Sequence, residues 1–207
     1  MVKVLNAGYV ELVEWMGGDK AVVRNARRCW QSEDRSTPEK DRKLIRMLLD
    51  KQHLTPFEAM VFTFDVKAPL FVARQWFRHR MGSFNEVSLR YCEANPEFYV
   101  PSGLSAPRAD LWHKDMTRQF EAYKYFVVLG MEQEQARALL PTGLYTKWYW
   151  TVNGSSLLNF LRLRTDKAAQ AEIREYALAI YSLVVGVAPV TFHEAGEGVL
   201  PLYHPTS

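Results

Sequence analysis

Residues 168–185, AAQAEIREYALAIYSLVV, contain the clearest helical pattern in the sequence. Apolar side chains recur at three- and four-residue spacing, which places them on one face of a helix. They are Ile173, Tyr176, Ala177, Ile180, Leu183 and Val184. Because an apolar face of this width needs another element to cover it, the pattern predicts a long C-terminal helix packed on the core.

The rest of the chain alternates between helical and extended patterns. Helices are predicted from Asp19, from Thr37-Pro38, from Pro69 through Arg80, from Trp112 through Val127, at 132–140 and at 155–164. Strands are predicted at 2–16, 61–67 and 146–152, and loops at 95–107 and from Pro189 onward. The predicted fold class is therefore α+β: a helix-dominated single domain over residues 1–207, with a small, mostly antiparallel sheet.

Composition excludes several classes of protein. The 207 residues are 48% hydrophobic and 24% charged, too apolar for a disordered chain. Lys and Arg (26) exceed Asp and Glu (23) by only 3, too little for a polybasic protein. Two cysteines, Cys29 and Cys92, cannot form a disulfide framework. With no signal-like start and no apolar stretch long enough for a bilayer, we expect a cytoplasmic protein without a membrane partner.

Cationic charge concentrates in residues 75–91, QWFRHRMGSFNEVSLRY. Residues 74–90 hold four arginines against one acid, an excess of 3 that equals the net charge of the whole chain. On the predicted helix, Gln75, Arg78 and His79 share one side, and Trp76 and Phe77 can anchor the other. Arginine favours bidentate capture of phosphate or carboxylate, so the segment predicts a pocket for a ligand with several negative charges.

The residues after this helix predict a second polar face. SFNEVSLRY is extended in character, and strand alternation would place Glu86, Ser88 and Arg90 together, opposite Val87 and Leu89. The simpler alternative is that these arginines are surface ion-pair partners.

The same segment spells R-H-R-x-x-S-x-N-E-x-S-x-R and resembles the signature of the flavin-dependent thymidylate synthases at every specified position. His53-Leu54-Thr55-Pro56-Phe57-Glu58 resembles the H-x-T-P-x-E segment of that family. Arg137 before LLP, Asn153 at the end of YWTVN, and Leu158-Asn159-Phe160 before Leu163-Arg164 extend the resemblance over nearly the whole chain.

The resemblance implies reductive methylation of dUMP to dTMP. Methylenetetrahydrofolate would supply the carbon, reduced FAD the hydride, and NADPH would reduce the flavin again. It also implies a homotetramer with active sites shared between subunits. The expected partners are thus dUMP, folate and NADPH, all of them anionic, and not a nucleic acid.

The resemblance also assigns residues to roles. Flavin contacts would come from His53, Thr55, Arg78, His79, Arg80, Glu86, Asn153, Ser155 and Asn159. The residues around dUMP would be Gln75, Trp76, Phe77, Arg78, Glu86, Val87, Ser88, Leu89, Arg90, Arg137 and Arg164. Arg164 would be catalytic: its guanidinium would stabilise negative charge as N3 of uracil loses its proton, which activates C5 without an enzyme nucleophile.

Competing interpretations use other residues of the same sequence. Ser88 as a covalent nucleophile would need an adjacent base. Cys29 and Cys92 lack the Pro-Cys context of the flavin-free thymidylate synthases, and no His or Cys pair has metal-ligand spacing on a helix, so no metal is expected. The rival functions are a single-stranded nucleic-acid binder, with bases stacked on the aromatic residues of 75–91, and a flavoprotein reductase with another acceptor.

Overall fold

The computed structural model describes residues 1–29, 31–32 and 36–202, and its centre is a five-stranded antiparallel sheet within these ranges. The strand order is β1-β2-β3-β5-β4. Their bounds are β1 Val2–Val4, β2 Gly8–Met16, β3 Val61–Pro69, β4 Ser83–Glu86 and β5 Tyr145–Asn153. The strands predicted at 61–67 and 146–152 are confirmed as β3 and β5, which pair along their whole length.

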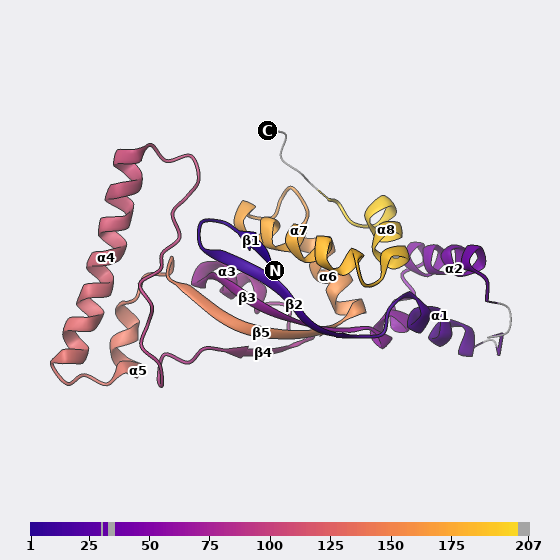
Figure 1. Cartoon of the computed structure of the whole chain (residues 1–207), viewed down its shortest axis with the longest axis horizontal. Coiled ribbons are helices and arrows are strands. Elements are labelled where there is room, and N and C mark those ends of the chain that lie inside the picture. Colours follow the sequence, from indigo (N-terminus) through magenta and orange to yellow (C-terminus); the bar gives the residue numbers. More distant parts are fainter. Residues whose placement is uncertain (30, 33–35, 203–207) are drawn as a thin grey trace.

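The helices account for most of the remaining chain (Figure 1). They are α1 Asp19–Arg28, α2 Pro38–Asp50, η2 Thr55–Ala59, α3 Leu70–Trp76, α4 Ala106–Val128, α5 Gln133–Ala136, η3 Arg137–Leu139, α6 Gly154–Arg164, α7 Ala171–Val185 and α8 Pro189–Gly198. The α+β class is thus confirmed. The predicted long C-terminal helix corresponds to α7, which has 15 residues and is followed by α8, whereas α4 is longer, with 23 residues.

In the part of the chain that the structure describes, helices cover one face of the sheet. In Figure 1, α6, α7 and α8 lie along one side of the strands, α1 and α2 lie at one end, and α4 and α5 form an arm at the other end. The opposite face carries exposed side chains, among them Glu11, Val13, Glu14 and Tyr149. The polar outward side chains of β2 and β5 allow this face to remain open in the single chain.

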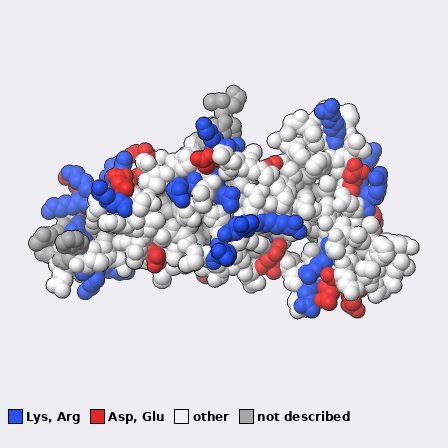
Figure 2. All heavy atoms as spheres, turned by 180° about the vertical axis from the view of Figure 1, so that it is seen from behind, with Lys and Arg blue, Asp and Glu red and all other residues white. Residues whose placement is uncertain are grey.

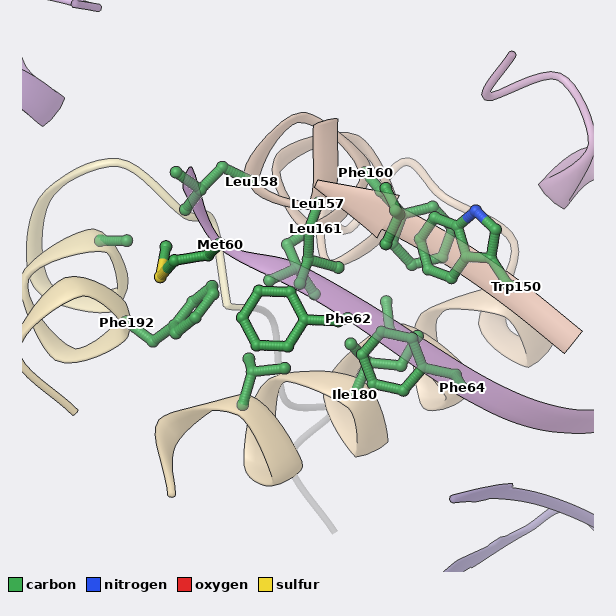
Figure 3. Packing of buried hydrophobic residues seen from close by; sticks show 14 of the residues in the cluster. Met60, Phe62, Phe64, Trp150, Leu157, Leu158, Phe160, Leu161, Ile180 and Phe192 are labelled. Carbon is green, nitrogen blue, oxygen red and sulfur yellow. The ribbon is translucent and has the colours of Figure 1, made fainter. Parts of the chain in front are cut away.

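The main core fills the space between the covered face of the sheet and the helices. Phe62 and Phe64 of β3 pack beside Trp150 of β5 and Phe160 of α6 (Figure 3). Ile180 of α7 closes the same cluster. Strand alternation on β3 and β5 and helical periodicity on α6 and α7 thus direct their apolar faces to one volume.

A second, smaller cluster lies in the arm. Phe98, from the loop before α4, packs against Phe120 and Tyr123 of α4, with Ala136 of α5 and Leu144 beside them. Only two residues of α4, Phe120 and Tyr123, are buried, so the apolar contact between α4 and the rest of the arm is narrow. The loop predicted at 95–107 is confirmed as far as Ser105, where α4 is about to begin.

The segment predicted as one strand, residues 2–16, forms two strands instead. The chain reverses after β1 with Leu5 at φ 56, and β1 then pairs with β2 so that Val2 lies opposite Val10. Asn6 in the turn donates from its amide to the Phe98 carbonyl (2.9 Å) and accepts from the Tyr145 hydroxyl (2.9 Å). Both partners are far away in sequence, so the local pattern could not indicate the turn.

The signature segment is also less regular than predicted. The helix from Pro69 was expected to reach Arg80, but α3 ends at Trp76. The extended stretch ends at Glu86, and the amide of Tyr91 donates to the Ser88 carbonyl (3.1 Å) in a turn. The predicted alternation of Glu86, Ser88 and Arg90 on one strand face is therefore wrong.

The tail predicted as loop from Pro189 contains α8. Both carboxylate oxygens of Asp19 cap this helix: they accept from the amides of Val190 (2.9 Å) and Thr191 (2.8 Å) and from the Thr191 hydroxyl (2.7 Å). This cap comes from the start of α1, so no local residue signals it. Residues 203–207, also part of that prediction, lie outside the described residues.

None of the helices in the described ranges is both long and apolar enough to cross a membrane.

Removal of the Asp19 cap should destabilise the fold. Asp19→Ala leaves the amides of Val190 and Thr191, in the first turn of α8, without their acceptor. We therefore expect a loss of about 2 kcal/mol in the free energy of unfolding, measured by urea titration. Asp19→Asn keeps one acceptor oxygen and should lose less. Asp110→Ala, an exposed acid of α4, should change stability by less than about 0.5 kcal/mol. Equal stability of Asp19→Ala and Asp110→Ala would show that this cap contributes nothing.

Candidate active site

A hollow of about 1050 Å³ opens beside the end of α3 and along α6. It is lined by Leu54, Gln75, Arg78, His79, Arg80, Met81, Trp150, Val152, Ser155, Ser156, Asn159, Leu163 and Arg164. These lining residues include three arginines and no Asp or Glu, so the hollow carries a concentrated positive charge. The rear face of the molecule shows a band of Lys and Arg atoms across its middle (Figure 2).

Trp76 holds the cationic turn of this hollow in place. Its indole is fully buried, and its ring centroid lies 5.2 Å from that of Trp148 and 5.3 Å from that of Trp150. The Trp76 carbonyl accepts from the amide of His79 (2.9 Å). Arg78, His79 and Arg80 therefore project from a short turn whose base is fixed in the core.

The opposite wall is the first part of α6. The Asn153 side chain accepts from the amide of Ser156 (2.8 Å) and caps the helix. Gly154 donates its amide to the Met60 carbonyl (2.8 Å), and a Cβ at this glycine would lie 2.5 Å from the Phe57 carbonyl oxygen. Only glycine allows η2 to approach α6 this closely. Ser155 and Asn159 then line the hollow from successive turns.

Arg164 joins the two walls. Its Nε donates to Nε2 of His79 (2.9 Å), and its Nη2 donates to the carbonyl of Gln75 (3.3 Å). The ring of His79 lies edge-on to Phe160, with 4.9 Å between the ring centroids. The catalytic residue expected from the sequence is thus in contact with two of the expected ligand-binding residues.

Burial and like charge depress the proton affinity of this pair. Burial first, and then the charge of Arg164, lower the pKa of His79 from 6.5 to about 4. Burial, followed by the nearby charge of Arg78, lowers the pKa of Arg164. His79 is therefore neutral and Arg164 charged at pH 7.

The remaining expected ligand residues of the signature lie outside this hollow. Glu86 and Val87 line a separate hollow of about 440 Å³ on the open face, beside Tyr9 and Asp65. Glu86 accepts from the Thr146 hydroxyl (2.7 Å). A single copy of the chain therefore divides the expected site between two surfaces.

Arg90 and Arg137 lie together at α5. Arg90 forms an ion pair with Glu134 (2.7 Å), and Nε of Arg137 donates to the Glu134 carbonyl (3.1 Å). Both arginines are exposed. Ser88 closes the turn before them, and Leu89 packs against the smaller core cluster.

Several expected ligand residues have other surroundings. Phe77 is half-buried and packs against Phe84 and Trp148, while Trp76 is fully buried. Their side chains belong to the core, so any influence on a ligand passes through the backbone that they fix. His53 and Thr55 are exposed on either side of Leu54, which lines the hollow.

Sequence reasoning missed other residues of the lining. Trp150 and Val152 reach the hollow from β5, and Leu163 reaches it from α6. Alternation in 146–152 indicates that Trp150 and Val152 share a face, but not that α6 ends above them. Ser156 follows Ser155, which was an expected flavin contact. Its position in the first turn of the predicted helix was the only sequence evidence that it could line the hollow.

Comparison with known proteins identifies the family. Residues 11–190 match the family model described as "Thymidylate synthase complementing protein". A flavin-dependent thymidylate synthase of Thermosipho africanus is 45% identical over 209 residues, covering 92% of this chain and 91% of that protein. The chain belongs to the flavin-dependent thymidylate synthase family. Membership makes it a methyltransferase enzyme, and the resemblance found in the signature is confirmed.

Other relatives agree. The flavin-dependent thymidylate synthase of Thermotoga neapolitana is 44% identical, with 92% of each chain covered. Among solved structures, the UMP/dUMP methylase PolB of Streptomyces cacaoi bound with 5-Br dUMP is similar at a TM-score of 0.85. It is 32% identical and covers 99% of this chain and 100% of its own. The likeness to that structure therefore extends over nearly the whole chain, including the arm.

Among the residues that the structure describes, no three His, Cys, Asp or Glu side chains form a group that could hold a metal ion. Cys29 and Cys92 are both free and exposed.

Proposed function

We propose that this chain catalyses the reductive methylation of dUMP to dTMP, with methylenetetrahydrofolate as the carbon donor and reduced FAD as the hydride donor. NADPH reduces the flavin again, and the reaction takes place in the cytoplasm. The observation that carries the proposal is the cationic hollow, where the signature residues Arg78, His79 and Arg80 meet Asn159 and Arg164 of α6.

The chemistry of the hollow fits a flavin dinucleotide. Arg78 and Arg80 supply exposed cations for a pyrophosphate, and no lining residue carries a negative charge that would oppose it. Ser155 and Asn159 supply uncharged hydrogen-bonding groups, and Leu54, Trp150 and Val152 an apolar surface for a ring. When bound, FAD supplies the hydride. His53, Thr55 and Asn153 flank the same hollow and complete the proposed contacts.

Arg164 is the proposed catalytic residue. It lies at the end of α6, partly buried, with its guanidinium fixed before any ligand arrives. A fixed cation stabilises negative charge that develops on the pyrimidine during loss of the N3 proton, and C5 becomes nucleophilic in consequence. No enzyme nucleophile is required, and neither Cys29 nor Cys92 is among the lining residues of the cationic hollow.

The proposed dUMP residues require more than one copy of the chain. Gln75, Arg78 and Arg164 share the cationic hollow, whereas Glu86, Val87, Ser88, Leu89, Arg90 and Arg137 lie beyond it. The open sheet face exposes Val13 (45%), Met16 (61%) and Tyr149 (51%), which a second copy can cover. We therefore include in the proposal a homotetramer whose sites combine the hollow of one subunit with residues 86–90 of another.

The reaction itself is tested by product analysis. Purified protein loaded with FAD should be yellow and should form dTMP from dUMP only when methylenetetrahydrofolate and NADPH are both present. Formation of another reduced product without dTMP would favour the reductase. A colourless protein that cannot be loaded with FAD, but binds oligonucleotides with steep salt dependence, would favour the nucleic-acid binder.

Substitution of Arg164 should separate chemistry from flavin binding. Arg164→Ala removes the cation from the pyrimidine, so kcat for dTMP formation should fall by about 10²–10³ while bound flavin is retained. Arg164→Lys keeps a charge without the planar fork and should recover only part of the loss. Arg118→Ala, an exposed arginine of α4, is the control and should keep full activity. Normal turnover by Arg164→Ala would remove the activating role.

Shared sites should allow two inactive variants to complement each other. In tetramers assembled from Arg164→Ala and Arg90→Ala subunits, roughly a quarter of the sites would combine an intact hollow with an intact Arg90. Activity should therefore reappear on mixing. Tetramers of Arg164→Ala with Gln75→Ala subunits should stay inactive, since both substitutions affect the same hollow. No recovery in the first mixture would place the whole site within one subunit.

A further inference from the structure

The guanidinium of Arg164 is oriented by the protein alone. Its Nε and Nη2 donate to His79 (2.9 Å) and to the Gln75 carbonyl (3.3 Å), so the Nε/Nη2 side is occupied. Nη1 has no hydrogen-bond partner in the described part of the chain. A guanidinium presents its donors as planar forks, and one fork faces the protein here while the fork that includes Nη1 remains for a ligand.

His79 can serve this contact only as a neutral acceptor. Nε2 accepts from Arg164, so in this arrangement the ring proton lies on Nδ1. A protonated imidazole would have two donors and no acceptor, and it would place a second positive charge 2.9 Å from the Arg164 nitrogen.

The surroundings of His79 hold it in that state. Arg164 faces it from α6, and Arg78 and Arg80 flank it in its own turn. Phe160 covers the ring from α6, and no Asp or Glu is among the lining residues of the hollow. Burial and the charge of Arg164 both lower its pKa, to about 4, so the ring is neutral from pH 7 down to the acid range.

We propose that His79 is a positioning residue for Arg164. Fixed through the Trp76 carbonyl and the Phe160 ring, its Nε2 occupies the Nε edge of the guanidinium and turns the Nη1 fork toward the pyrimidine of dUMP. This role is distinct from any contact of His79 with flavin. The inference rests on the function proposed above, because it describes how Arg164 binds the pyrimidine of dUMP.

Orientation in advance has a definable benefit. An arginine side chain at a protein surface loses rotamer entropy when it binds a ligand, and a preorganised one loses less. Two contacts already restrict Arg164 before binding. Loss of the His79 contact should therefore weaken dUMP binding as well as slow the reaction, and both effects should require Arg164 to be present.

A double-mutant cycle on the FAD-loaded enzyme tests this dependence. The variants are His79→Phe, which keeps a ring without an acceptor, Arg164→Ala, and the two combined. His79→Phe should weaken dUMP binding, measured by calorimetry, by about tenfold or more, the loss typical of a hydrogen bond to a charged group. In the Arg164→Ala background the same substitution should change the dUMP Kd by less than about twofold.

Rescue and flavin content complete the experiment. His79→Gln supplies a carbonyl oxygen as a neutral acceptor and should restore dUMP affinity to within about threefold of wild type. The flavin content of each variant is measured, and dUMP affinity is compared between samples with equal flavin occupancy. Equal losses of dUMP affinity in both backgrounds, or no rescue by glutamine, would each overturn the positioning role.

The inference and the proposed function fail differently. If the wild-type enzyme forms dTMP but the cycle is additive, only the role of His79 is wrong. If the wild-type enzyme neither binds dUMP nor forms dTMP, both are wrong.

Discussion

Burial of the Trp76 indole is the interaction on which the rest of the site depends. The ring is fully buried among Trp148 and Trp150 of β5, Phe160 of α6 and Tyr176 of α7. It therefore ties the end of α3 to the sheet and to two helices at once. Burial of an aromatic side chain contributes several kcal/mol, on the order of 3–5 when it is lost from a core. That energy fixes the turn that carries Arg78, His79 and Arg80.

This anchoring is needed because the three arginines of the hollow repel one another. Three arginines and a histidine line it, with no carboxylate among the lining residues. Without ligands, like charges in such a space disfavour the folded state. Burial first, and then the charge of a neighbouring arginine, lower the pKa of His79 and of Arg164. Apolar packing beneath the turn offsets the repulsion. An anionic ligand relieves the repulsion between these charges when it binds. The energy that the repulsion costs the free protein therefore contributes to the binding affinity.

The sequence indicated the chemistry of the site more reliably than its shape. Helix and strand patterns predicted β3, β5, α6 and α7, since their periodicity reflects which face is buried. The end of α3 at Trp76 was missed because the aromatic pair Trp76-Phe77 continues the helical pattern into a turn. The capping of α8 depends on Asp19, which lies 171 residues from Val190. The contact between Arg164 and His79 likewise joins residues 85 apart. Local spacing contains no information about such pairs, although it indicated both residues separately.

The two halves of residues 78–90 face different ways, and the position of β4 explains this. β4 is an edge strand with only β5 beside it, and it begins just after the cationic turn. Gly82 permits the crossing, since a Cβ there would lie 2.8 Å from Nε1 of Trp150. Glu86 ends β4 and, with Val87, lines the hollow beside Tyr9 and Asp65 and not the cationic one. A segment of contiguous residues thus places one set of polar groups in the cationic hollow and another set outside it. Under the proposed tetramer, the same short strand would contribute residues to two sites. That role accounts for the many polar residues in this exposed segment.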